Sequence, residues 1–134
     1  MIGVIIPDRG DRPEFLENCL RMLKAQTIQP TIIEIVNDAP LSDEKDITLR
    51  YRLGYERLRN KGIEVIALIE NDDWYAPNYL ETMYNKWIEL GKPELLGQGY
   101  TIYYHIKERA WFTMNHPERS SAMNTFIKPD LNFD

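Results

Sequence analysis

The stretch from Val65 to Tyr75 constrains the fold of this chain more than any other. The apolar residues Val65 to Ile69 run directly into the polar sequence Glu70-Asn71-Asp72-Asp73, and a helix-compatible pattern begins just beyond it. If the apolar run is a buried strand, Asp72 and Asp73 emerge at its carboxyl end, where open α/β sheets usually place their ligand sites. Our working hypothesis is therefore that this strand end forms the active site.

The rest of the chain alternates between strand and helix patterns. Strands are predicted at residues 2–6, 31–36 and 63–69, and helices at about 11–23, 47–61 and 77–90. Strands separated by helix-length connections are typical of right-handed parallel βαβ units. Beyond Gly91 the chain is rich in aromatic residues, which predicts an antiparallel hairpin of residues 95–106 and 110–114, and a further strand at 122–127.

These patterns predict one domain over residues 1–134, of α/β class. The expected architecture is a three-layer α/β/α, Rossmann-like mixed sheet, with parallel N-terminal strands followed by an antiparallel C-terminal hairpin region. Trp87 and Cys19 fall on the apolar stripes of their helices and are expected in the core.

Composition excludes several classes of function. A formal net charge of −5 argues against nonspecific nucleic-acid binding, which needs a basic face. Cys19 is the only cysteine, so an intramolecular disulfide and a thiolate metal cluster are both excluded. No apolar run approaches the roughly 18 residues of a membrane span, and no charged segment precedes the first apolar run as in a signal peptide. These features predict a cytoplasmic protein without a transmembrane segment.

Each of the three predicted parallel strands is followed by acid. Asp8 follows the first strand, Asp38 the second, and Asp72 and Asp73 the third. The carboxyl ends of parallel strands lie on one edge of a sheet, so these side chains are expected in one crevice. Crowded carboxylates repel one another unless a cation lies among them, and their oxygens suit Mg²⁺ or Mn²⁺. Such a metal with open positions points to a nucleotide diphosphate as ligand.

Structural explanations compete with this hypothesis for each acid taken alone. Asp72 or Asp73 could cap the next helix, and Asp38 could form an Asx turn. The coincidence at three strand ends favours the functional interpretation. A group of arginines in the second helix is interpreted as its solvated face rather than as an anion site. These arginines are Arg50, Arg52, Arg57 and Arg59.

Several motifs in order resemble the opening of family-2 glycosyltransferases with the GT-A fold. They are Val4-Ile5-Ile6-Pro7, Arg12-Pro13-Glu14-Phe15-Leu16, Ala25-Gln26-Thr27, Ile35-Val36-Asn37-Asp38 and the DXD-like segment Asn71-Asp72-Asp73-Trp74-Tyr75-Ala76-Pro77-Asn78-Tyr79-Leu80. The resemblance covers the first eighty or so residues and weakens after Gly91. Asn37 stands where the family usually has aspartate, and Ala39-Pro40 replaces a common small polar pair.

The resemblance implies a nucleotide-diphospho-sugar site with Mn²⁺ or Mg²⁺. It would place Pro7 and Asp8 beside the nucleoside, Asp38 near the base and Asp72 near the ribose or sugar. It would place Asp73 on the metal. Trp74 and Tyr75 would shape the sugar and acceptor side, although one of them could equally pack behind the loop.

The resemblance further implies a hexosyltransferase-like enzyme that moves the sugar to a saccharide or other hydroxyl acceptor. If the reaction inverts the anomeric centre, it requires a general base. No residue is assigned to that role, since neither Asp130 nor Asp134 matches the family's base. The chain is accordingly expected to be truncated, a minimal donor-binding domain, or a relative without turnover. The alternatives are a noncatalytic nucleotide-sugar or sugar-binding module and, more distantly, a nucleotidyltransferase.

Overall fold

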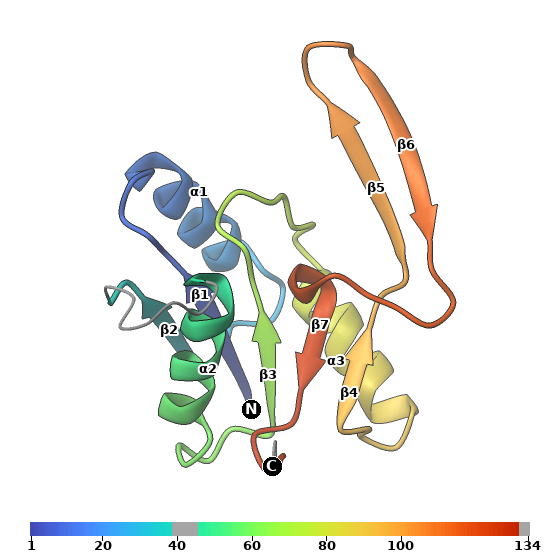
Figure 1. The fold of residues 1–134 in the computed structure, drawn as a ribbon. Coiled ribbons are helices and arrows are strands. Elements are labelled where there is room, and N and C mark those ends of the chain that lie inside the picture. Colours follow the sequence, from blue (N-terminus) through green and yellow to red (C-terminus); the bar gives the residue numbers. More distant parts are fainter. Residues whose placement is uncertain (39–45, 132–134) are drawn as a thin grey trace.

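The computed structural model describes residues 1–38 and 46–131 (Figure 1); Ala39, Pro40 and Asp134 lie outside them. Its helices are α1 (Pro13–Lys24), α2 (Asp46–Leu58), α3 (Tyr79–Glu89) and the short 3₁₀ helix η1 (Ala122–Asn124). Its strands are β1 (Ile2–Pro7), β2 (Ile32–Val36), β3 (Val65–Leu68), β4 (Leu95–Gly97), β5 (Tyr100–His105), β6 (Ala110–Asn115) and β7 (Thr125–Ile127).

The main sheet has the strand order β2-β1-β3-β7-β4. β1 pairs in parallel with β2 and with β3, so the three carboxyl ends lie together at one edge, as predicted. β7 lies antiparallel between β3 and β4. The fold is therefore α/β with a mixed, Rossmann-like sheet, and the predicted fold class is confirmed.

Helices cover both faces of this sheet and form three layers (Figure 1). Alternate side chains of β1 and β3 point to opposite faces, because successive residues of a strand do so. One face packs against α1 and α3, around Leu23, Trp87 and the completely buried Cys19. The other face packs against α2, around Tyr55 and Leu58. No described helix has both the length and the apolar character needed to span a bilayer.

The C-terminal third differs from the prediction in its pairing. The expected first hairpin strand is divided: Leu95–Gly97 joins the main sheet as β4, and only Tyr100–His105 pairs with β6. Gly99 lies at the division, where a Cβ atom would come within 2.2 Å of the carbonyl oxygen of His116. The expected strand at 122–127 begins as a 3₁₀ turn, and only Thr125–Ile127 is extended.

Arg50 corrects the expectation that the arginines of α2 form a solvated face. Its side chain is buried, and its Nη1 donates hydrogen bonds to the carbonyl oxygens of Asp8, at 2.8 Å, and Val36, at 3.0 Å. Its Nε pairs with Asp46 at 2.9 Å. Arg50 thus ties α2 to the carboxyl ends of β1 and β2, at the edge that carries the acids.

Helix starts also differ from the prediction. α1 begins at Pro13 with Arg12 as its capping residue, later than the predicted start at about residue 11. α3 begins at Tyr79 with Asn78 as its cap, so neither Asp72 nor Asp73 caps it. This finding removes the structural alternative for the two aspartates.

Candidate functional site

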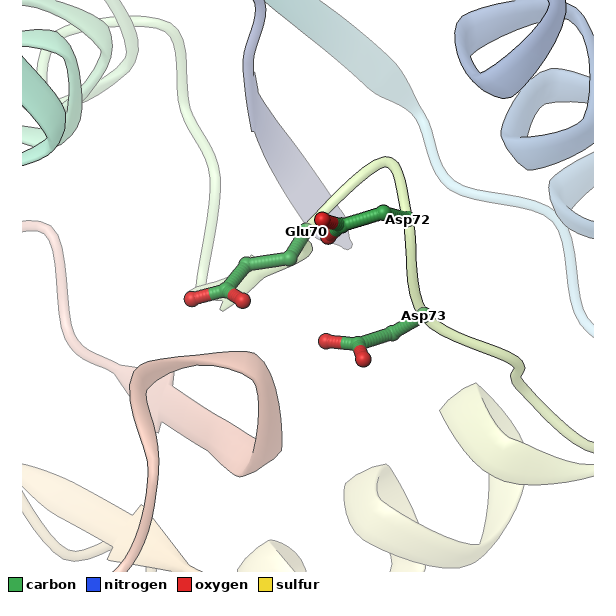
Figure 2. Close-up of side chains that lie close together, drawn as sticks. All are labelled: Glu70, Asp72 and Asp73. Atoms are coloured by element: carbon green, nitrogen blue, oxygen red, sulfur yellow. The ribbon is translucent and has the colours of Figure 1, made fainter. Parts of the chain in front are cut away.

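The loop that follows β3 brings three carboxylates together at the edge where the parallel strands end. Glu70, Asp72 and Asp73 each offer one oxygen atom, and these three atoms lie within 4.8 Å of one another. Figure 2 shows all three side chains turned to the same side of the loop. The strand end singled out in the sequence is therefore a compact acidic cluster, with Glu70 as an additional member.

Buried hydrogen bonds fix the loop that carries this cluster. The backbone N–H of Ile69 donates to the carbonyl oxygen of Ile5 at 3.0 Å, which extends the contact of the loop with β1. The hydroxyl of Tyr75 accepts a hydrogen bond from the backbone N–H of Glu70 at 3.0 Å and donates to the carbonyl oxygen of Met123 at 3.3 Å. The buried Tyr75 thereby links the acidic loop to η1.

Crowding and partial burial make the cluster unfavourable without a counter-charge. Burial, and then the charges of Asp73 and Asp72, raise the pKa of Glu70 to about 7. Burial and the charge of Asp72 also raise the pKa of Asp73. The Oδ2 atom of Asp73 is buried without a hydrogen-bond partner. An unsatisfied buried carboxylate oxygen is costly unless a cation or donor reaches it.

The donor set fits a hard divalent cation. Its ligands would be carboxylate oxygens from Glu70, Asp72 and Asp73, which Mg²⁺ and Mn²⁺ prefer. A cation among them would relieve the repulsion that raises the two pKa values. The unpartnered Oδ2 atom of Asp73 is a second, independent indication of a cation at this position.

A cleft of about 410 Å³ opens on one side of the cluster. Its lining combines the end of β1, the first turn of α2 and the acidic loop. Arg12 crosses it and pairs with Asp72, with 3.1 Å between its Nη1 and a carboxylate oxygen. The lining residues are Pro7, Arg9, Arg12, Asp46, Ile47, Arg50, Glu70, Asn71 and Asp72.

A larger cleft of about 600 Å³ opens on the other side of the cluster, toward the β5–β6 hairpin. Its lining is mainly aromatic and aliphatic, and Asp72 borders both clefts. The lining residues are Asp72, Asp73, Trp74, Tyr75, Thr101, Ile102, Tyr103, Tyr104, Ile106, Met123 and Asn124. The acidic cluster thus separates a charged cleft from an aromatic one.

The residues predicted beside the nucleoside occupy different environments. Pro7 lines the smaller cleft. Asp8 is buried and does not belong to that lining, but its carboxylate accepts a hydrogen bond at 3.1 Å from the side chain of Asn71, which does. Asp38 lies apart from that lining and pairs with Arg57 at 2.9 Å, and this hydrogen bond lowers the pKa of Asp38.

The two aromatic residues predicted on the acceptor side differ clearly in their exposure to solvent. Trp74 projects outward with 76% of its surface exposed, whereas Tyr75 is buried beneath the loop. Both border the larger cleft. Of the two, Tyr75 is the one that packs behind the loop, as one of the open alternatives anticipated.

Sequence reasoning assigned no role to Glu70, Arg12 or Asn71. Glu70 could have been found, since it is the first charged residue after the apolar run and shares its strand end with the two aspartates. Arg12 comes from the loop after β1 and reaches Asp72 across 60 positions of sequence. No local sequence pattern predicts such a contact.

The fold and site therefore define a Rossmann-like α/β domain with a carboxylate cluster between two clefts. No family model matches the chain. Two curated proteins are similar to it. "Putative glycosyltransferase EpsH" of Bacillus subtilis strain 168 is 34% identical over an alignment of 87 residues, which includes 52% of this chain and 25% of that protein.

"Glycosyltransferase GlyA" of Streptococcus pneumoniae serotype 4 is 22% identical over an alignment of 155 residues, which includes 97% of this chain and 22% of that protein. The aligned part spans about a quarter of the length of each of these relatives. Both of these relatives are named as glycosyltransferases.

Proposed function

We propose that this chain binds a nucleotide-diphospho-sugar together with Mn²⁺ or Mg²⁺, as part of a glycosyltransferase that moves the sugar to an acceptor hydroxyl. The observation that carries the proposal is the place of the acidic cluster, at the carboxyl edge of the parallel strands and between two clefts that share Asp72. The similarity to two proteins named as glycosyltransferases supports the same reaction class.

The smaller cleft suits the nucleotide half of the donor. Arg9, Arg12 and Arg50 line it beside the carboxylates Asp46, Glu70 and Asp72, so a diphosphate would be held by these arginines together with the metal. Glu70, Asp72 and Asp73 would hold the metal beside it, and Pro7 and Asp8 would border the nucleoside. A bound divalent cation stabilises the negative charge that develops on a departing nucleoside diphosphate.

The larger cleft would then take the acceptor, beside Trp74. An inverting transfer needs a base on the acceptor hydroxyl, and Asp72 and Asp73 are the only carboxylates in the described lining of this cleft. That observation favours a second candidate, a noncatalytic nucleotide-sugar-binding module of the same fold.

Isothermal titration tests the donor site directly. The chain is titrated with UDP, GDP, CDP, ADP and dTDP in Mn²⁺, in Mg²⁺ and in EDTA. We expect saturable binding of at least one nucleotide that requires the metal and weakens at least tenfold in Asp73→Asn. Asp130→Asn is the matched control, because Asp130 follows β7 at the opposite edge of the sheet. Binding that is equal in EDTA and unaffected by Asp73→Asn would refute the metal site.

Turnover separates the two candidates. The sugar donor of the nucleotide that binds is incubated with the chain, Mn²⁺ and a saccharide mixture, and release of nucleoside diphosphate is followed by chromatography. Release above the rate of Asp73→Asn indicates a transferase. Metal-dependent binding without release indicates the noncatalytic module.

A further inference from the structure

We propose that the larger cleft binds a neutral oligosaccharide and that Trp74 and Tyr104 are the surfaces on which its rings stack. The inference rests on the proposed function, since it treats this cleft as the acceptor side of the acidic cluster. It adds the chemical class of the acceptor, and it assigns acceptor binding to the β5–β6 hairpin.

The dimensions of the cleft fit a chain of sugars. Its volume of about 600 Å³ lies within the range of roughly 300–1,000 Å³ that small-ligand sites occupy. One wall follows β5 from Thr101 to beyond Tyr104, and at about 3.4 Å per residue this strand is longer than one sugar ring. The acidic cluster lies at one end of the cleft, and Ile106, next to the hairpin turn, borders it as well.

Exposed aromatic rings in the cleft wall indicate the kind of ligand. Trp74 is 76% exposed and Tyr104 59% exposed. Large aromatic side chains are more stable when they are removed from water, so exposed rings in a cleft wall indicate a ligand that covers them. Flat aromatic faces complement the C–H faces of pyranose rings, while hydroxyl groups at the rim of the sugar need hydrogen bonds. Asn124 in the cleft lining can supply such a bond. Its Nδ2 donates to Thr101 Oγ1 at 2.9 Å, which orients the side-chain amide, and its side-chain oxygen Oδ1 can accept a hydrogen bond from a sugar hydroxyl.

Charge selects a neutral ligand. The described lining of this cleft contains no lysine, arginine or histidine. A phospholipid headgroup, a nucleic acid or a sialylated or sulfated glycan would therefore lose hydration along the aromatic wall without a cationic side chain to compensate for it. A neutral oligosaccharide has no such cost and can stack on the aromatic wall.

Two exposed apolar side chains provide the variant and its control. Trp74 lines the cleft, whereas Leu90 at the end of α3, 52% exposed, lies outside its lining and away from the hairpin. An immobilised array of neutral, sialylated and sulfated oligosaccharides is probed with the chain, and the affinity of each retained glycan is measured by titration without nucleotide. We expect neutral glycans to be retained, and Trp74→Ala and Tyr104→Ala each to weaken them about tenfold. Leu90→Ala is expected to leave the affinity unchanged.

Four outcomes overturn the inference. They are retention of no neutral glycan, preference for acidic glycans, an equal loss in Leu90→Ala, and self-association in sedimentation equilibrium that Trp74→Ala abolishes. The last outcome would assign the aromatic wall to a second copy of the chain.

Parallel titrations with nucleoside diphosphate and Mn²⁺ separate this inference from the proposed function. Nucleotide binding without glycan binding refutes the inference alone. Glycan binding that depends on Trp74, without nucleotide binding, supports the inference as a saccharide site and refutes the proposed donor.

Discussion

Glu70 is the side chain in which the energetic cost of the acidic cluster is most visible. Its carboxyl group is half-buried beside Asp72 and Asp73, and ionisation there adds a third negative charge to the group. The pKa of Glu70 is therefore about 7, compared with an ordinary value of 4.5. Near neutral pH and without metal, ionisation of this residue opposes folding.

This cost predicts the pH dependence of stability in metal-free buffer. Between pH 4.5 and 7 the folded protein retains a proton on Glu70 that the unfolded chain has lost, so the free energy of unfolding falls as the pH rises. Denaturant unfolding in EDTA at several values from pH 5 to 8 is expected to show a smaller fall in Glu70→Gln. Glu89→Gln, an exposed change on α3, is the control and should follow the wild type. Equal slopes in the wild type and Glu70→Gln would contradict the prediction.

For single residues, the sequence predicts which side chains lie together when they are neighbours in the chain. It does not predict contacts between side chains that are distant in the chain and meet only in the folded protein. Asp72 and Asp73 could be found because an apolar strand ends beside them. Asp38 shows the limit, since its position after a parallel strand was predicted correctly but its side chain turns to Arg57. The direction of a side chain at a strand end depends on its neighbours in space.

Helix α2 shows how one element positions the edge of the sheet. Gly54 allows the helix to lie close to β1, because a Cβ atom there would come within 2.5 Å of Ile5 Cγ2. Arg50, one turn earlier, satisfies the carbonyl oxygens of Asp8 and Val36. Close packing and a buried guanidinium group thus hold the ends of β1 and β2 in place beneath the smaller cleft.

Arg50→Ala is expected to lower the free energy of unfolding by about 3 kcal/mol, because it leaves buried carbonyl oxygens without their charged donor. Arg59→Ala, directly after the end of the same helix, is the control. Arg59 is partly exposed and pairs with Glu56 on the surface, so its removal should cost less than about 1 kcal/mol. Urea unfolding of the two variants measures the difference, and equal losses would show that burial of Arg50 contributes nothing.

Gly54→Ala is expected to destabilise the protein by about 1–3 kcal/mol, although alanine normally favours a helix. The added methyl group would force α2 away from Ile5 and Val36. Thermal unfolding measures the effect, with Glu56→Ala as the control at an exposed position of α2. A gain in stability would mean that the helix has room to move.

The elements of the first ninety residues could be predicted because each has a clear period and a clear end. The burial of Arg50 could not be predicted, since a charge on an amphipathic helix normally faces water. The carbonyl oxygens of Asp8, just after β1, and Val36, at the end of β2, reverse that preference. Strand β7 lies within the strand predicted at 122–127, but its position in the sheet could not be predicted. Its place between β3 and β4 depends on pairing with residues distant in sequence.

The molecule as a whole consists of a layered body and a projecting hairpin (Figure 1). β5 and β6 form a separate two-stranded sheet, closed at its base by a hydrogen bond from the backbone N–H of His116 to the carbonyl oxygen of Gly99 at 3.0 Å. An isolated ribbon is marginally stable, and the stacked rings of Tyr103 and Phe112, 5.1 Å apart, support this one. The acidic loop lies between the two parts, with one cleft on each side.

This division predicts that donor and acceptor binding can be separated by deletion. In a variant that replaces residues 100–115 with a Gly-Ser linker, Gly99 and His116 are already hydrogen-bonded and the linker joins them without disturbing the main sheet. We expect the variant to retain cooperative unfolding and metal-dependent nucleotide binding, because the smaller cleft contains no hairpin residue. Saccharide binding should disappear. Circular dichroism and titration with each ligand provide the measurements, and loss of nucleotide binding in a folded variant would place the hairpin in the donor site.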